Sequence, residues 1–253
     1  MSSPLSAQTV KHHHRLLCKV LNDAIDWEFV ETNVAKKAKP PKPMRYKPVT
    51  YTESELKRLL EAAKQSPIYS PIIYTAGHTG GRLGELRPLK WKDIDFDSRK
   101  IYITKTAYDV KKEGVKIKDM TKNGRDRYVV MGKHLLAFLK KHWENHLKLK
   151  KELGKDFNPL DLVFPSSVGT YLIPSEITRA YKRAIKRVEL PDSRFHDLRH
   201  SHATILLLKN VHPKIVSDRL GHSKISITLD LYSHAIPSLQ DGAVDVFDEV
   251  FDD

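Results

Sequence analysis

Four prolines within nine residues divide this chain more sharply than any other feature of its sequence. They are Pro40, Pro41, Pro43 and Pro48, in the segment KAKPPKPMRYKP. Each proline fixes its own φ and lacks a backbone N–H, so no helix or strand continues through such a segment. Proline-rich segments are stiff and extended. The sequence therefore predicts a linker over residues 40–49 that joins two separate parts.

The linker is basic, and so is the chain as a whole. Lys39, Lys42, Arg45 and Lys47 lie in or beside the linker. The 253 residues include 44 Lys and Arg against 31 Asp and Glu, a formal net charge of +13. Such a surplus favours a polyanionic partner, most often nucleic acid, and the linker cations suit a phosphate backbone. A solvated lysine-rich surface explains the same charge without any partner.

Two further features of the composition restrict the setting in which the chain works. Cys18 is the only cysteine, which excludes an internal disulfide and a cysteine metal cluster. No run approaches 18 apolar residues, and the N-terminus lacks a secretory apolar region. We therefore expect no membrane association and a reducing, cytoplasmic location.

Hydrophobic periodicity predicts a mainly helical chain. Residues 6–27 repeat apolar side chains at helical spacing after Ser6, a capping residue, and a short helix follows over 28–38. Beyond the linker, Thr52 and Glu55 form a capping-box pattern. Further helices are expected at residues 52–65, 68–79, 133–152, 174–188, 195–209, 213–220 and 225–234.

One stretch, residues 94–131, departs from this helical pattern. KIYITKTAY, GVKIKDMTK and DRYVVM alternate apolar and polar side chains and are rich in β-branched residues, and Asn123-Gly124 is a hairpin turn signal. We predict a three-stranded antiparallel sheet. The fold class is therefore α+β, mainly α: a helical domain over residues 50–239 that contains one small sheet.

Several polar residues stand at places where chemistry is possible. In TGGRLGEL, Arg82 lies three residues before Glu85, on the same helical face, so that the carboxylate can hold the guanidinium. A purely structural ion pair explains this segment equally well. Lys122 precedes the Asn-Gly turn and would lie at a hairpin tip, although an ordinary surface lysine is the simpler interpretation.

The segment HDLRHSHAT places His196 and Arg199 three residues apart at the start of a helix, with His200 near the same face. The spacing of His196 and His200 also suits zinc, but the glutamate of a zinc helix is missing and Arg199 would repel a metal. We therefore expect no metal. His202 is expected to pack in the protein or to contact a DNA backbone.

Two further segments, LGHSKISIT and LDLYSHA, supply His222, just after Gly221, and Tyr232. Tyr232 is equally consistent with a core residue. The helices expected at 213–220 and 225–234 also fit a helix-turn-helix. Taken in this order, the four segments between Thr50 and Ala235 resemble the tyrosine recombinases, the phage integrase family.

This resemblance implies a role for each of these residues. Arg82 and Arg199 would be the two catalytic arginines, and Lys122 the hairpin lysine. His196 and His222 would be the two catalytic histidines. Tyr232 would be the nucleophile, and Glu85 would support the site. The implied enzyme is a site-specific recombinase or integrase that cleaves and rejoins DNA strands through a 3′-phosphotyrosine intermediate.

The resemblance also implies partners. They are double-stranded DNA and further copies of the chain, assembled as a tetramer on DNA at the nucleoid, for integration or excision of a mobile element. Because a covalent link conserves the energy of the broken bond, no small-molecule cofactor is expected. Residues 1–39 would be part of a helical core-binding domain, and residues 50–239 the catalytic domain.

The acidic tail, residues 240–253, carries Val244, Phe247, Val250 and Phe251 on one helical face. By resemblance it would dock onto a neighbouring protomer, although folding onto its own domain or a frayed end fits as well. Two other functions stay open: a helix-turn-helix regulator without catalysis, and an enzyme of the topoisomerase IB type that nicks and closes DNA.

Overall fold

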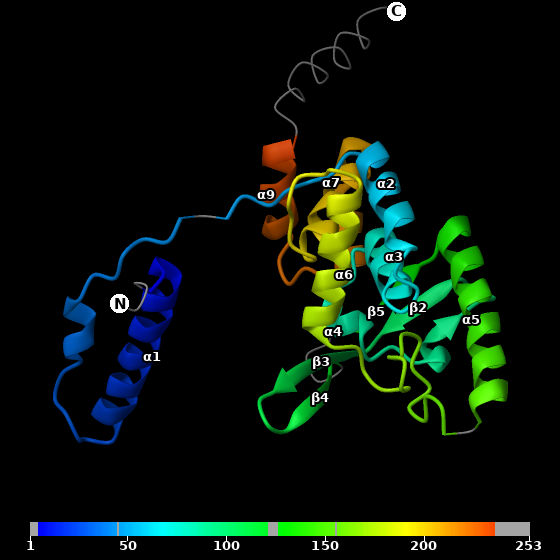
Figure 1. Cartoon of the computed structure of the whole chain (residues 1–253). Helices are drawn as coiled ribbons and strands as arrows, with labels where there is room; N and C mark the ends of the chain where they lie inside the picture. Colours follow the sequence, from blue (N-terminus) through cyan, green and yellow to red (C-terminus); the bar gives the residue numbers. More distant parts are fainter. Residues whose placement is uncertain (1–4, 45, 121–125, 155, 236–253) are drawn as a thin grey trace, which may run out of the picture. The chain divides into compact units, whose positions relative to one another are not determined.

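The computed structural model describes residues 5–44, 46–120, 126–154 and 156–235, with side chains described up to residue 230 (Figure 1). The chain divides into two compact units, residues 1–47 and 48–253. The boundary lies at the end of the proline-rich segment, whose described residues form no helix or strand.

The first unit consists of helix α1 (Ala7–Asp26) and the short 3-10 helix η1 (Val34–Lys37). The Ser6 hydroxyl accepts a hydrogen bond from a backbone N–H of the first turn, so the predicted N-cap is confirmed. His14 Nε2 donates to the Ala35 carbonyl at 2.9 Å and ties the two helices together. No residue of α1, all of which is described, is buried.

Eight helices of the second unit are described, and most match a predicted one. They are α2 (Glu53–Ala63), α3 (Ser70–Thr79), α4 (Leu83–Leu86), α5 (Lys133–Leu153), α6 (Pro174–Arg187), α7 (Asp197–Leu208), α8 (Pro213–Leu220) and α9 (Ser226–Ala235), beside a 3-10 turn, η2 (Trp91–Asp93). The capping box of Thr52 and Glu55 is present. The short helix α4 is not among the predicted helix ranges, although the predicted pair of Arg82 and Glu85 implies a helical turn there.

The strands differ from the prediction in how they pair. They are β1 (Ile94–Asp95), β2 (Lys100–Ile103), β3 (Lys105–Val110), β4 (Gly114–Asp119) and β5 (Arg127–Val130). The stretch KIYITKTAY is two strands, broken at Thr104, and not one. The order of the three-stranded antiparallel sheet is β1-β2-β5, while β3 and β4 form a separate two-stranded hairpin. The predicted Asn123-Gly124 turn lies outside the described residues.

Two apolar clusters hold the second unit together. The larger one joins α2, α3, α5, α6, the start of α7 and the three-stranded sheet. The β3–β4 hairpin is separate from that sheet, and its strand β3 lies against α4 (Figure 1). The smaller cluster consists of Ala203, Leu207, Val216 and Leu220 and packs α8 against α7. This cluster fixes the position of the C-terminal end of α8 against α7. The predicted fold class, α+β and mainly α, is confirmed.

Candidate active site

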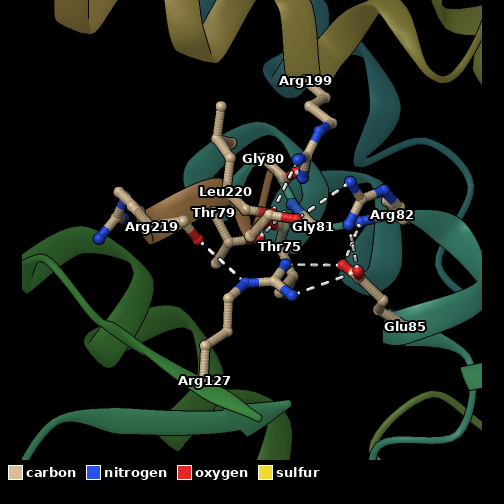
Figure 2. A network of polar contacts seen from close by, with 11 residues as sticks. Thr75, Thr79, Gly80, Gly81, Arg82, Glu85, Arg127, Arg199, Arg219 and Leu220 are labelled. Carbon is tan, nitrogen blue, oxygen red and sulfur yellow. Dashed lines mark hydrogen bonds and ion pairs between the residues drawn. The ribbon is translucent and has the colours of Figure 1, made fainter. Parts of the chain in front are cut away.

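The C-terminal end of α8 gathers arginines from three distant segments. Three consecutive carbonyls each accept a hydrogen bond from a different arginine: Arg219 O from Arg127 Nε at 3.1 Å, Leu220 O from Arg199 Nη2 at 2.7 Å, and Gly221 O from Arg82 Nη2 at 3.2 Å (Figure 2). The last carbonyls of a helix lack partners within the helix and form the negative end of its dipole. They therefore stabilise guanidinium groups that would otherwise repel one another.

Arg199 connects the ends of two helices. Besides the Leu220 carbonyl, it donates from Nη1 to the Gly80 carbonyl at 2.8 Å, where α3 ends. Gly80 has a φ of 65°, the left-handed conformation that favours glycine at this position. Burial and the nearby Arg82 lower the pKa of Arg199 to about 9. The buried guanidinium therefore remains charged at neutral pH.

Arg82 and Glu85 form the pair that the sequence predicts, at the start of α4. Arg82 Nη1 lies 2.7 Å from Glu85 Oε1, and the Arg82 backbone N–H donates to Glu85 Oε2 at 2.9 Å. Glu85 is 2% exposed. Burial alone would raise the pKa of this carboxyl, but hydrogen bonds and charge from Arg127, and then from Arg82, hold its pKa below 4.5. Glu85 is therefore a buried carboxylate shared by two arginines.

Arg127 is a site residue that the sequence motifs do not include. It is the first residue of β5, and it binds both oxygens of Glu85 with Nη1 at 3.2 Å and Nη2 at 2.7 Å. Nothing in the sequence marks it, because 42 residues separate it from Glu85. Only folding brings the two segments together.

His196 stands at the N-cap of α7, and its ring meets the ring of His200 edge-on, with centroids 5.3 Å apart. Burial, followed by the charges of His200, Arg199 and Arg82, lowers the pKa of His196. The imidazole is therefore neutral at pH 7 and able to accept a proton. A cavity of about 310 Å³ opens beside His196, and its lining includes Lys182.

His222 follows the glycine that ends α8 and faces α9. Its Nδ1 lies 2.7 Å from the hydroxyl of Thr228, a buried residue of α9. Burial, and then the charges of Arg199 and Arg82, lower the pKa of His222 to about 4. The ring is therefore neutral at pH 7. Tyr232 belongs to α9, one helical turn beyond Thr228, and its side chain is outside the described part.

His202 packs inside the protein. Nδ1 donates to the Gly77 carbonyl at 3.1 Å, and Nε2 accepts from Arg219 Nε at 3.1 Å. Burial and Arg219 lower its pKa to about 3. Arg219 also donates to the carbonyls of Val130 and His78. Of the two alternatives for His202, packing is the one observed, and a DNA-backbone contact is excluded for this buried ring.

Lys122 and Arg45 are not among the described residues, and Lys39, Lys42 and Lys47 are exposed in the first unit. Within the described residues, no group of three or more His, Cys, Asp or Glu side chains is placed to hold a metal. The same residues include no helix long and apolar enough to cross a membrane.

Comparison with known proteins shows the family to which the chain belongs. Residues 50–238 match the model of the phage integrase family. A XerC-like tyrosine recombinase of Caldanaerobacter subterraneus subsp. tengcongensis is 30% identical over 264 residues, which cover 97% of this chain and 67% of the relative. The ICEBs1 integrase of Bacillus subtilis is 28% identical, covering 99% of this chain and 68% of its own length. The chain therefore belongs to the phage integrase family and is a tyrosine-type site-specific recombinase.

Solved structures share the fold. A Tn1549 transposon integrase in complex with a circular intermediate DNA superposes with a TM-score of 0.79 at 21% identity, covering 95% of this chain and 80% of the integrase. A lambda integrase dimer bound to a COC′ core site gives a TM-score of 0.65 at 20% identity, covering 89% and 73%. The resemblance stated from the sequence motifs is confirmed.

Proposed function

We propose that this chain cleaves and rejoins double-stranded DNA through a 3′-phosphotyrosine intermediate at Tyr232, in the integration or excision of a mobile element. Family membership supports the reaction class. Relatives that include the ICEBs1 integrase and several prophage and phage integrases support the mobile-element role. DNA complexes of integrases with the same fold support the nature of the substrate.

The reaction that we propose is a balanced transesterification. The hydroxyl of Tyr232 attacks a DNA phosphorus, the bond to the 5′-oxygen breaks, and a bond between phosphorus and tyrosine forms. His196 takes the proton of the tyrosine, and Lys122 gives a proton to the departing 5′-oxygen. A 5′-hydroxyl of another strand then reverses these steps. No external energy source is required, since one phosphoester replaces another.

One observation carries this proposal: Arg82 and Arg199 are fixed on neighbouring carbonyls at the end of α8, directly before His222. The transition state gathers negative charge on the non-bridging phosphate oxygens. Planar guanidinium groups match these oxygens and stay charged at neutral pH. Donors already in place for such charge typically contribute about 10²- to 10³-fold each to the rate.

The charge states of the histidines fit the same chemistry. Burial lowers the pKa of both His196 and His222, so both are neutral at pH 7. A neutral His196 is able to act as a base, as the proton transfer from Tyr232 requires. A neutral His222 is able to donate a hydrogen bond to a phosphate oxygen without adding another positive charge beside two arginines.

The test is a trapping experiment with the full chain. A target sequence is first obtained by selection from random duplex DNA and then prepared as a nicked suicide substrate. We expect a covalent protein–DNA adduct on a denaturing gel with the wild type and none with Tyr232→Phe. If the wild type forms no adduct, or Tyr232→Phe forms as much, the proposed chemistry is wrong and the chain acts as a DNA-binding regulator. Relaxation of supercoiled plasmid without strand exchange would instead indicate a nicking-closing enzyme.

We further propose assembly as a tetramer on DNA at the nucleoid, with residues 240–253 docking onto a neighbouring protomer. The acidic tail complements the basic remainder of the chain, and the spacing of its apolar residues fits one face of a helix. Deletion of 240–253 should leave binding to one DNA half-site unchanged and abolish the larger complex in native gels. Unchanged assembly would contradict the docking.

The exposed linker cations are proposed to contact the DNA backbone. Replacing Lys39, Lys42 and Lys47 together with Gln should weaken binding to all sequences alike. The slope of log K against log salt should become shallower by about three, because each phosphate contact releases about one counterion. An unchanged slope would place the linker away from DNA.

A further inference from the structure

Arg127 uses all three of its nitrogens, although it is only 9% exposed at its side chain. Nη1 and Nη2 bind the two oxygens of Glu85 in a fork, and Nε donates to the carbonyl of Arg219. A bidentate arginine–carboxylate pair fixes the relative orientation of its partners as well as their distance. Arg127 therefore joins α4, where Glu85 lies, to the end of α8.

The same two elements are the anchors of Arg82. Its guanidinium binds Glu85 Oε1 at 2.7 Å and the Gly221 carbonyl at 3.2 Å (Figure 2). The carbonyl that Arg127 binds lies two residues before Gly221 in the chain. Each anchor of Arg82 is thus held, directly or through adjacent backbone, by Arg127.

We propose that Arg127 is a positioning residue for the reaction: it fixes Glu85 and the end of α8 in one frame, so that Arg82 meets the scissile phosphate in the productive orientation. This inference rests on the proposed function. The side chain of Arg127 is largely buried and turned to Glu85, so it acts through Arg82 and not on DNA.

The backbone at Gly221 is packed directly on this guanidinium. A Cβ at Gly221 would lie 2.7 Å from Arg127 Nη1 and 2.9 Å from its central carbon. Gly221 also has a φ of 68°, which favours glycine. The segment that leads from α8 into His222 therefore rests on the face of Arg127, and any shift of the guanidinium would reach both Gly221 and Glu85.

Arg127→Lys tests the fork while keeping the charge. A lysine ammonium is a point charge that cannot bind two carboxylate oxygens and a carbonyl in fixed geometry. Misplacement of a catalytic group by about 1 Å costs up to about 10²-fold in rate. We expect adduct formation on the suicide substrate to slow by about tenfold to a hundredfold. DNA affinity, measured in the Tyr232→Phe background, should stay within about twofold.

The chain offers a matched control in Arg87. Its side chain is 2% exposed, its Nη1 and Nη2 bind the two oxygens of Asp109 at 2.7 and 3.0 Å, and its Nε donates to the Leu172 carbonyl at 2.8 Å. Arg87→Lys therefore removes the same kind of fork and the same kind of carbonyl contact, but not beside Arg82. Rates are compared per folded chain, with the folded fraction taken from near-UV circular dichroism. Arg87→Lys should cleave at the wild-type rate.

Two further measurements separate positioning from general damage. As the pH is lowered, the cleavage rate of Arg127→Lys should begin to fall at a higher pH than the rate of the wild type. The reason is that Glu85, which also faces Arg82 and Arg199, loses hydrogen bonds that favour its ionised form. Gly221→Ala keeps Arg127 but displaces its guanidinium, and it should slow cleavage in the same way.

Several results would overturn this role. They are a wild-type rate for Arg127→Lys, an equal loss for Arg87→Lys, or a loss that lies entirely in DNA affinity. A wild-type adduct together with any of these refutes the role of Arg127 alone. An absent wild-type adduct refutes the proposed function and this role with it.

Discussion

Replacing Glu85 by glutamine should destabilise the second unit more than any surface change of the same kind. The carboxylate accepts four hydrogen bonds, at 2.7 and 3.2 Å on Oε1 and at 2.9 and 2.7 Å on Oε2. An amide nitrogen in place of either oxygen turns two of them into contacts between donors. Hydrogen bonds to charged groups contribute about 1.5–3 kcal/mol each, so two losses amount to about 3–6 kcal/mol.

Partial exposure of one partner reduces this figure. The Arg82 side chain is 38% exposed, so water compensates part of its loss, whereas the Arg127 side chain, 9% exposed, has little such compensation. We expect a loss of about 3–5 kcal/mol in the free energy of unfolding, the range for breaking one side of a buried ion pair. Urea denaturation followed by circular dichroism at pH 7 measures it. A loss under about 1 kcal/mol would contradict the shared-carboxylate interpretation.

The control and the pH dependence make the test specific. Glu144→Gln removes an exposed pair with Lys141 and should change stability by less than about 0.5 kcal/mol. Because the folded-state pKa of Glu85 lies below 4.5, its stabilisation is complete above that pH and disappears as pH falls through the folded-state value. The difference between wild type and Glu85→Gln should therefore be constant above about pH 5 and shrink under more acidic conditions. A difference that grows towards low pH would refute the reasoning.

Three further predictions concern the surroundings of this cluster. His222 should titrate near pH 4 in ¹⁵N-detected NMR of the histidine rings, because burial and two arginines disfavour its charged form; a midpoint near 6.5 would contradict this. Gly80→Ala should cost about 1–3 kcal/mol in thermal unfolding, since its φ is 65° and a Cβ would lie 2.4 Å from Leu220 Cδ2. Ser193→Ala should cost about 1–3 kcal/mol, because its hydroxyl is 2.7 Å from that of the buried Tyr181, and a neutral effect would mean that water replaces it.

Much of the helical framework was predictable because its signals are local. Ser6 and the pair Thr52 and Glu55 begin helices, and the glycines at 80 and 221 end them, through contacts within a few residues. The i, i+3 ion pair of Arg82 and Glu85 is local in the same sense. Contacts of this kind depend on residue types and spacings within a few positions, so the sequence alone is enough to predict them.

The sheet was less predictable because the pairing of its strands depends on tertiary contacts. Strand β4 is exposed on both faces at most of its positions, so alternation marks it as a strand without indicating its partner. Strand β1 has only two residues, Ile94 and Asp95, too few to show a period. Hydrogen bonding across the folded unit, and not the local pattern, decided that β5 pairs with β2.

The arginine contacts at α8 were beyond the sequence for another reason. Their acceptors are backbone carbonyls, which every residue has. The residue types at 219–221 therefore do not indicate the interaction. The pair of Arg127 and Glu85 likewise forms only when folding brings β5 beside α4. The roles of the motif residues stay predictions, while the folded chain shows how Arg82, Glu85 and Arg199 are held.

Main-chain acceptors at the end of α8 have a consequence for evolution. Side-chain substitutions along this helix leave its carbonyl oxygens in place. The acceptors of the arginine hydrogen bonds therefore survive substitutions that would remove a carboxylate acceptor. What it does not tolerate is a change in the helix's length or in where it terminates. Insertions or deletions within residues 213–220 should therefore be far rarer among active variants than point replacements in the same segment.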